Sequence, residues 1–110
     1  MFPAKIKMDV ATISASGVGG VVDVLSYTGV CSFKASAAFD GGTTPSAAYK
    51  LQDCATSNGT FADVTGAAFS TDGDLVFDTR DLKRYIKLYA TLSGSPTSAS
   101  IALAVAGVED

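Results

Sequence analysis

The chain has 110 residues with 8 Lys and Arg against 11 Asp and Glu, a net charge of −3, and it contains no His, no Trp and 2 Cys. A chain of this length forms one small domain, so we expect a single unit over residues 1–110. His is the usual general base and a common metal ligand, so its absence excludes most hydrolase, transferase and metalloenzyme mechanisms. The composition therefore favours a protein that is not an enzyme and uses no cofactor or metal.

The charge pattern argues against two classes of partner. The basic residues are scattered apart from Lys83-Arg84, so no basic stripe is available to neutralise phosphates. No apolar run reaches the ~18 residues that cross a bilayer, and residues 1–9 lack the apolar stretch of a secretory signal. We therefore expect a protein that is made in the cytoplasm and binds neither nucleic acid nor membrane.

The polar composition predicts strands and turns. Of the 11 acidic residues 10 are Asp and only Glu109 is Glu, and Ser, Thr and Gly together make 34 residues. Asp and Gly favour turns, whereas the charged residues that favour helices are scarce. A hydrophobic content of 47% is too high for a disordered tail. We therefore expect a folded all-β domain.

Turn-forming residues divide the chain into segments of strand length. The predicted turns lie at 17–20, 40–45, 57–59, 72–74 and 93–96. The predicted strands lie at 5–14, 21–27, 30–39, 46–54, 60–65, 67–71, 74–78, 84–92 and 99–107. We expect a single antiparallel β-sandwich of about eight strands, of jelly-roll or immunoglobulin-like type, with one helical turn at 81–83.

The start of the chain is an uncharged segment, Met1-Phe2-Pro3, that precedes the first predicted strand. We predict that residues 1–4 form an arm that has no role in the core and orders on contact with a neighbour. Phe2 and Pro3 are therefore candidate interaction residues.

Three motifs are interpreted as turns and not as sites. Gly17-Val18-Gly19-Gly20 lacks the Lys-Ser/Thr and the helix of a phosphate loop. The acidic residues of Asp72-Gly73-Asp74, with Asp78 and Asp81, match no calcium loop, and Asp beside Gly is common in turns. Asn58-Gly59 favours a type I′ hairpin turn.

The alternation of apolar and polar residues places the two cysteines on opposite sides of the predicted sheet. Cys31 falls in the apolar row of 30–39, whereas Cys54 lies on the row opposite to Tyr49 and Leu51. If strands 30–39 and 46–54 pair as a hairpin with both apolar rows on one side, the two thiols point to opposite sides of the sheet. We therefore predict two free thiols, with Cys31 in the core.

The last two predicted strands have matching apolar rows, which predicts that they pair as a hairpin over 84–107. The rows are Ile86, Leu88, Ala90 and Leu92 in the first strand, and Ala99, Ile101, Leu103 and Val105 in the second. The other face of this hairpin would set Tyr85 and Tyr89 over a row of alanines, covered by a loop of the same chain or by another subunit. Tyr85 and Tyr89 are therefore candidate interaction residues.

Three segments, 49–53, 57–64 and 78–87, resemble small head proteins of tailed bacteriophages, of the capsid decoration or cement type. In that pattern a hairpin with Leu-Gln, Asp-Gly, an aromatic residue and Asp-Val precedes an Arg-Tyr-Ile strand. Here Asn58-Gly59 stands for Asp-Gly, and Phe61 for the frequent Trp. The resemblance implies a virion protein, synthesised in the bacterial host cytoplasm, that binds the major capsid protein on the outer surface of the head and forms a homo-oligomer, a dimer or trimer.

The same segments also have a structural interpretation. Leu51, Phe61, Val64 and Ile86 are predicted core residues, and Arg84 is predicted to lie near Asp78 or Asp81.

A similar order of strand, turn and aromatic motifs occurs in jelly-roll carbohydrate-binding and discoidin-like domains. The alternative function is therefore a sugar-binding module, on a virion or elsewhere. Such a module would stack a sugar ring on an exposed aromatic side chain. The candidates are Tyr27, Tyr49, Tyr85 and Tyr89 or a loop Phe, and the absence of Trp counts against this alternative.

Overall fold

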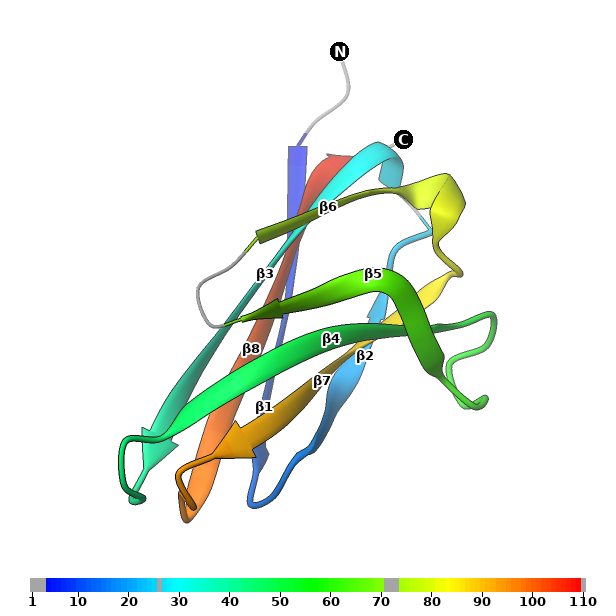
Figure 1. Ribbon diagram of the computed structural model, residues 1–110. Helices are drawn as coiled ribbons and strands as arrows, with labels where there is room; N and C mark the ends of the chain where they lie inside the picture. Colours follow the sequence, from blue (N-terminus) through cyan, green and yellow to red (C-terminus); the bar gives the residue numbers. More distant parts are fainter. Residues whose placement is uncertain (1–3, 26, 71–73, 110) are drawn as a thin grey trace.

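Eight strands and one short 3-10 helix make up the computed structural model, which describes residues 4–25, 27–70 and 74–109 (Figure 1). The elements are β1 (Ala4–Ile13), β2 (Gly17–Asp23), β3 (Tyr27–Asp40), β4 (Ser46–Cys54), β5 (Ala62–Ser70), β6 (Asp74–Asp78), η1 (Thr79–Asp81), β7 (Tyr85–Ser93) and β8 (Ser98–Glu109). The helical turn lies two residues before its predicted position, because the Asp78 side chain accepts a hydrogen bond from the Arg80 backbone and caps the turn there. No helix in these described ranges is long and apolar enough to cross a membrane.

The strands form two four-stranded antiparallel sheets that pack as two layers (Figure 1). Sheet A has the order β1-β8-β3-β6, and sheet B has the order β2-β7-β4-β5. The pairs β1 with β8, β2 with β7, β3 with β6 and β4 with β5 are those of one long hairpin rolled into two layers. This arrangement is the jelly roll. The predicted β-sandwich is confirmed, and the jelly roll is the one of its two predicted types that forms.

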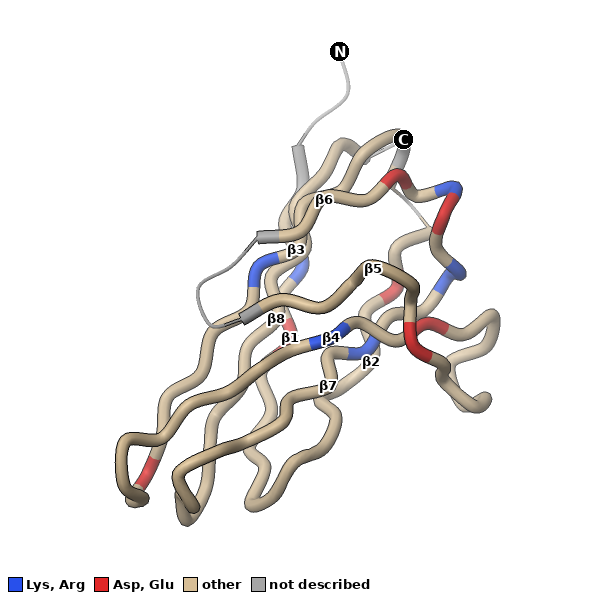
Figure 2. Tube along the Cα trace, viewed as in Figure 1, with Lys and Arg blue, Asp and Glu red and all other residues tan. Residues whose placement is uncertain are grey.

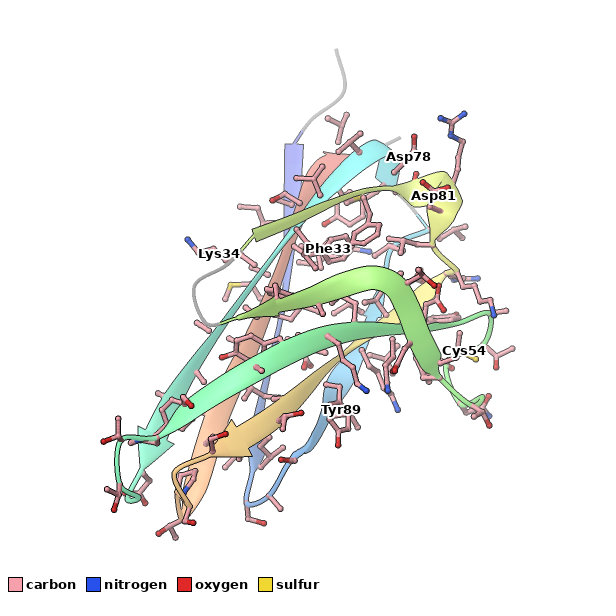
Figure 3. The ribbon with its side chains drawn as sticks, in the orientation of Figure 1. Phe33, Lys34, Cys54, Asp78, Asp81 and Tyr89 are labelled. Atoms are coloured by element: carbon pink, nitrogen blue, oxygen red, sulfur yellow. The ribbon has the colours of Figure 1, made fainter. Side chains whose placement is uncertain are left out.

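The inner faces of the two sheets share one hydrophobic core. Its largest fully buried side chains are Phe33, Leu51, Ile86, Leu88, Ile101, Leu103, Val105 and Cys31. Phe33 points between the layers, whereas its neighbour Lys34 points to the outside (Figure 3). Burying a large apolar side chain contributes about 1.5–3 kcal/mol, so the alternation that the sequence shows in β3, β4, β7 and β8 decides which face turns inward.

The predicted hairpin between the last two strands is wrong. β7 lies in sheet B between β2 and β4, and β8 lies in sheet A between β1 and β3. The connection crosses from one sheet to the other, and it turns through Gly94 at φ 84° and Ser95 at φ 52°. The two apolar rows are both buried, as predicted, but they face each other across the core. Alternation alone does not separate the two arrangements, because both bury the same rows.

The same correction applies to β3 and β4, which lie in different sheets and do not pair. Cys31 lies in the core, and burial raises the pKa of its thiol. Cys54 lies at the far end of β4, outside the core (Figure 3). Both cysteines are free thiols, as predicted, although the pairing used to predict this is wrong.

One predicted turn and one predicted break between strands are replaced by strand. Residues Gly17–Gly20 open β2 instead of forming a loop, because the Gly20 backbone N–H donates to the Asp9 carboxylate at 2.8 Å. The predicted strands 60–65 and 67–71 are the single strand β5. Gly66, at φ 78°, takes up the shift in register against β4 that was read as a break.

The connection from β4 to β5 runs over residues 55–61, so Asn58-Gly59 does not form the predicted two-residue turn. Within this loop the Gly59 backbone N–H donates to the Thr56 carbonyl at 3.5 Å.

Candidate functional site

The predicted interaction residues divide between one face of the molecule and the undescribed start of the chain. Tyr85 and Tyr89 both lie half-buried on the outer face of sheet B. Phe2 and Pro3 lie outside the described residues, so their role stays a prediction. Ala4 is the first residue of β1 and pairs with Val108, so a free arm is left to residues 1–3 alone.

The outer face of sheet B carries cations over aromatic rings. The Arg84 guanidinium lies 4.9 Å from the centroid of the Tyr85 ring, and Lys50 Nζ lies 4.8 Å from that of Tyr89. Lys87 Nζ lies 4.4 Å from the Phe61 ring centroid, so Phe61 belongs to this face and its predicted place in the core is wrong. Each contact of this kind contributes about 0.5–1 kcal/mol at an exposed site. The chain itself therefore covers part of each ring.

Two of these cations, Arg84 and Lys50, also form ion pairs with aspartates. Arg84 donates two hydrogen bonds to Asp23 Oδ2, at 3.2 and 2.9 Å, and not to its predicted partners, because β2 lies directly beside β7. The Arg84 hydrogen bonds hold the pKa of Asp23 below its ordinary value. Gln52 and Lys50 bind the two oxygens of Asp63 at 2.9 and 3.0 Å and lower its pKa in the same way. This face is therefore polar and internally paired.

The outer face of sheet A has the opposite character. Its exposed apolar side chains are Ile6, Met8, Val10, Val30, Val76 and Val108. On β1, Ile6 is 67% exposed, Met8 65% and Val10 62%. In a folded monomer such high exposure is usual for polar side chains. Beside these β1 side chains, β8 presents Ala102, Ala104 and Ala106, which are half-buried. The alanines are therefore neighbours of the β1 side chains and not of the tyrosines, as was predicted.

The charged residues of β1 explain why its apolar row points outward. Lys7 Nζ donates to the Asp23 carbonyl at 2.6 Å and lies 5.4 Å from the centroid of the Tyr27 ring. Asp9 accepts from the Gly20 backbone. Both charged groups therefore have partners on the inner side of this edge strand, where the two sheets approach each other, and the alternate residues are turned to the outside. Inward-pointing charges are a known means of protecting an edge strand.

The apolar face of sheet A carries little charge. Of the side chains described at its centre, Lys34 on β3 alone is charged, and its amine points away from the sheet (Figure 3). In Figure 2 many of the charged residues lie around β4, β7 and the segment after β6. The Lys7 and Asp9 side chains of β1 have their partners on the inner side. An exposed surface of mainly apolar side chains is typical of a site that contacts another molecule.

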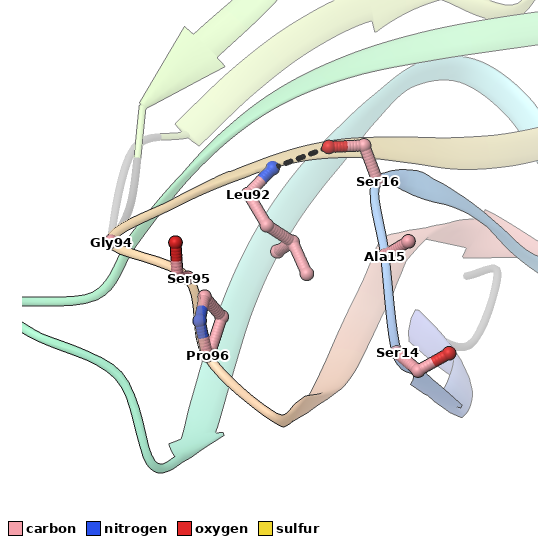
Figure 4. Close-up of a pocket in the computed structure, with 7 residues that line it drawn as sticks. All are labelled: Ser14, Ala15, Ser16, Leu92, Gly94, Ser95 and Pro96. Atoms are coloured by element: carbon pink, nitrogen blue, oxygen red, sulfur yellow. Dashed lines mark hydrogen bonds between the residues drawn. The ribbon is translucent and has the colours of Figure 1, made fainter.

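A pocket of about 230 Å³ lies at the end of the sandwich where β1 turns into β2 (Figure 4). Its lining residues are Ser14, Ala15, Ser16, Leu92, Gly94, Ser95 and Pro96. Ser16 Oγ already accepts a hydrogen bond from the Leu92 backbone at 2.9 Å (Figure 4). The lining holds no acid, base or thiol, so its serine hydroxyls have no neighbouring base in the lining that could activate them as nucleophiles.

The acidic stretch near β6 is only partly described. Asp72 and Gly73 lie outside the described residues, and the Asp78 carboxylate is held by the Arg80 guanidinium at 2.9 Å, which lowers the pKa of Asp78. Within residues 4–25, 27–70 and 74–109, no three His, Cys, Asp or Glu side chains gather as metal ligands.

Known proteins match this chain in fold. The SPBc2 prophage-derived protein YomS aligns with a TM-score of 0.62 at 13% identity, over 97% of this chain and 97% of its own. The Cyanophage Pam1 capsid aligns with a TM-score of 0.56 at 12% identity, over 99% of this chain and 86% of its own. The mitogen of Yersinia pseudotuberculosis aligns with a TM-score of 0.54 at 14% identity, over 98% of this chain and 89% of its own.

No protein-family model matches the sequence, and no curated protein is significantly similar to it. At these identities the structural matches show the fold alone, which a prophage-derived protein, a chain of a cyanophage capsid and a mitogen share.

Proposed function

We propose that the chain is a non-enzymatic structural protein of a bacteriophage virion, a capsid decoration or cement protein that binds the major capsid protein on the outside of the head. The observation that carries this proposal is the apolar outer face of sheet A, formed by three large β1 side chains more than half exposed and by the alanines of β8. Exposed apolar surfaces are typical of sites that contact other molecules, and a role in an assembly would supply that contact. The phage head resemblance of segments 49–53, 57–64 and 78–87 supports the same role.

The two outer faces suit two different contacts. They point in opposite directions, so one can meet a further subunit while the other meets the shell (Figure 1). We assign the shell contact to the polar face of sheet B around Tyr85 and Tyr89, together with Phe2 and Pro3. Many copies bind one shell at the same time, so a weak contact for each copy is enough to strengthen the head.

The sugar-binding alternative keeps few of its candidate residues. Tyr27 and Tyr49 are 4% and 2% exposed, so neither ring can stack on a sugar. Tyr85 and Tyr89 each have a cation over the ring. Of the four tyrosines, the two that reach the surface are therefore already in contact with Arg84 and Lys50.

Co-sedimentation tests the proposal. Purified protein is mixed with shells, lacking this protein, of the phage whose genome encodes it, and bound protein is measured after centrifugation. We expect saturable binding that unlabelled protein displaces. Recovery of all the protein in the supernatant would overturn the proposal, and specific retention on a glycan array would favour the sugar-binding alternative.

A further inference from the structure

We propose that a second copy of this chain covers the β1 and β8 part of the outer face of sheet A, so that these strands of the two copies pack face to face about a two-fold axis. The inference rests on the proposed role in an assembly and names the surface and the partner. A two-fold contact uses the same patch on both copies, so the patch has to be complementary to itself. The residues of β1 and β8 meet this condition.

The complementarity comes from side-chain length. On β1 the outward row is long, with Ile6, Met8 and Val10, and on β8 the outward row is short, with three alanines. The strands are neighbours, about 4.8 Å apart. A row of long side chains next to a row of short ones is the arrangement in which a rotated copy fits its own surface.

The position of the axis follows from this arrangement. An axis parallel to the strands and midway between β1 and β8 sets β1 of one copy over β8 of the other, at the usual sheet separation of about 10 Å. Met8 is the register partner of Ala104 within one chain, so Met8 of one copy then lies over Ala104 of the second copy. The methionine side chain enters the space that the alanine leaves, and the same contact occurs twice.

The charge distribution agrees with this axis. Lys34 lies on β3, on the side of β8 away from β1. The rotated copy ends at its own edge strand β1 before it reaches that position, so the Lys34 amine stays in water and no unpaired charge is buried. The polar face of sheet B remains free for the shell.

The size of the contact sets its strength. Two strands of about ten residues measure about 10 by 33 Å, or about 330 Å² in projection. Two such faces bury about 700 Å² before the protruding side chains are counted, which is below the size of a standard stable interface. We therefore expect a reversible dimer in isolation, which becomes stable when the shell holds both copies at a high local concentration.

The test is the mass of the isolated protein as a function of concentration, measured by analytical ultracentrifugation. The wild type is expected to rise from 11.1 kDa toward twice that mass. Met8→Asp should remain a monomer, with a dissociation constant raised at least about tenfold, because it places two unpaired charges in the contact. Val21→Asp, an exposed apolar residue on the edge strand of sheet B, is the matched control and should dimerise like the wild type.

A cross-linking measurement keeps the test decisive if Met8→Asp fails to fold. In a Cys54→Ser background, Met8→Cys and Ala104→Cys proteins are mixed and treated with a short bis-maleimide. A mixed dimer should form, whereas Val21→Cys with Ala104→Cys should not cross-link above background.

The outcomes separate this inference from the proposed function. A wild type that stays a monomer up to about 0.5 mM, where even a weak dimer would be populated, overturns the dimer. The dimer proposal is also overturned if the dimer dissociates in the Val21→Asp variant but persists in the Met8→Asp variant. If the protein dimerises but does not bind to shells, this inference stands and the proposed function is wrong. A monomer whose binding to shells is lost in Met8→Asp overturns the dimer and moves the shell contact to sheet A.

Discussion

The carboxylate of Asp9 accepts a hydrogen bond from the backbone N–H of Gly20 at 2.8 Å, and this bond connects an edge strand of sheet A to an edge strand of sheet B. It turns the charged row of β1 inward and leaves the apolar row outside. A single interaction on the inner side of β1 thus helps to determine which surface the molecule presents to its partners.

Gly20→Ala tests this relationship. A Cβ at Gly20 would collide with the Asp9 carboxylate, so we expect a loss of about 1–3 kcal/mol in the free energy of unfolding. Gly17→Ala in the same strand is the control, because its Cβ would meet only the Ala15 carbonyl at an ordinary 3.7 Å. Denaturant melts in which the two variants lose equal stability would contradict the close approach of Asp9.

The buried row of β7 makes a second prediction. Leu88 is 2% exposed, so Leu88→Ala should cost about 2–5 kcal/mol. Lys87→Ala removes a half-buried side chain on the outer face and should cost less than about 1 kcal/mol. Equal shifts of the denaturant midpoint would mean that the faces of β7 are reversed.

The two thiols should differ in reactivity. A hydrogen bond from the backbone N–H of Thr56 lowers the pKa of the half-buried Cys54 thiol, while burial raises that of Cys31. In the native protein we expect one thiol to react with a disulfide reagent, and the second only after unfolding. Cys54→Ser should abolish the fast phase. If that variant keeps it, the assignment of the reactive thiol is wrong.

The pH dependence of stability follows from Asp23. Its pKa is depressed in the folded protein, so its contribution is present above the ordinary value of about 3.9 and is lost as the pH falls through the folded pKa. Asp23→Asn should therefore lower the thermal midpoint at pH 7, and the difference from the wild type should shrink as the pH falls below about 3.9 toward the lowered folded pKa. A difference that stays the same as the pH falls through this acidic range would show that the ion pair with Arg84 contributes no stability.

Strands and their buried faces could be predicted from the sequence, because alternation reports directly on burial. The partners of those strands could not. Ile86 and Val105 belong to apolar rows that satisfy burial equally well side by side in one sheet or opposite each other in two sheets. Only the path of the chain through Gly94 and Ser95 separates the two, and that path depends on the whole roll of eight strands.

The apolar surface was missed for a related reason. In β1 the sequence alternates between Lys7 or Asp9 and apolar residues, and burial alone would turn the apolar row inward. The charged row faces inward because Asp23 and Gly20 of β2 supply its partners, and these lie outside the strand itself. The alanines of β8 were a visible signal in the sequence, but they were assigned to the wrong neighbours.

The last prediction concerns attachment to the shell. Tyr89→Asp would place a carboxylate in the contact assigned to sheet B, so we expect binding to shells to fall by at least tenfold while the thermal midpoint changes little, because Tyr89 is only half-buried. Ser36→Asp, an exposed position on β3 in sheet A, is the control and should bind like the wild type. Deleting residues 1–3 should also weaken attachment and leave the isolated fold intact; Ala4 is kept because it pairs with Val108. Gel densitometry of sedimented shells at equal protein concentration decides the matter, and full occupancy by both altered proteins would remove Tyr89 and the first three residues from the shell contact.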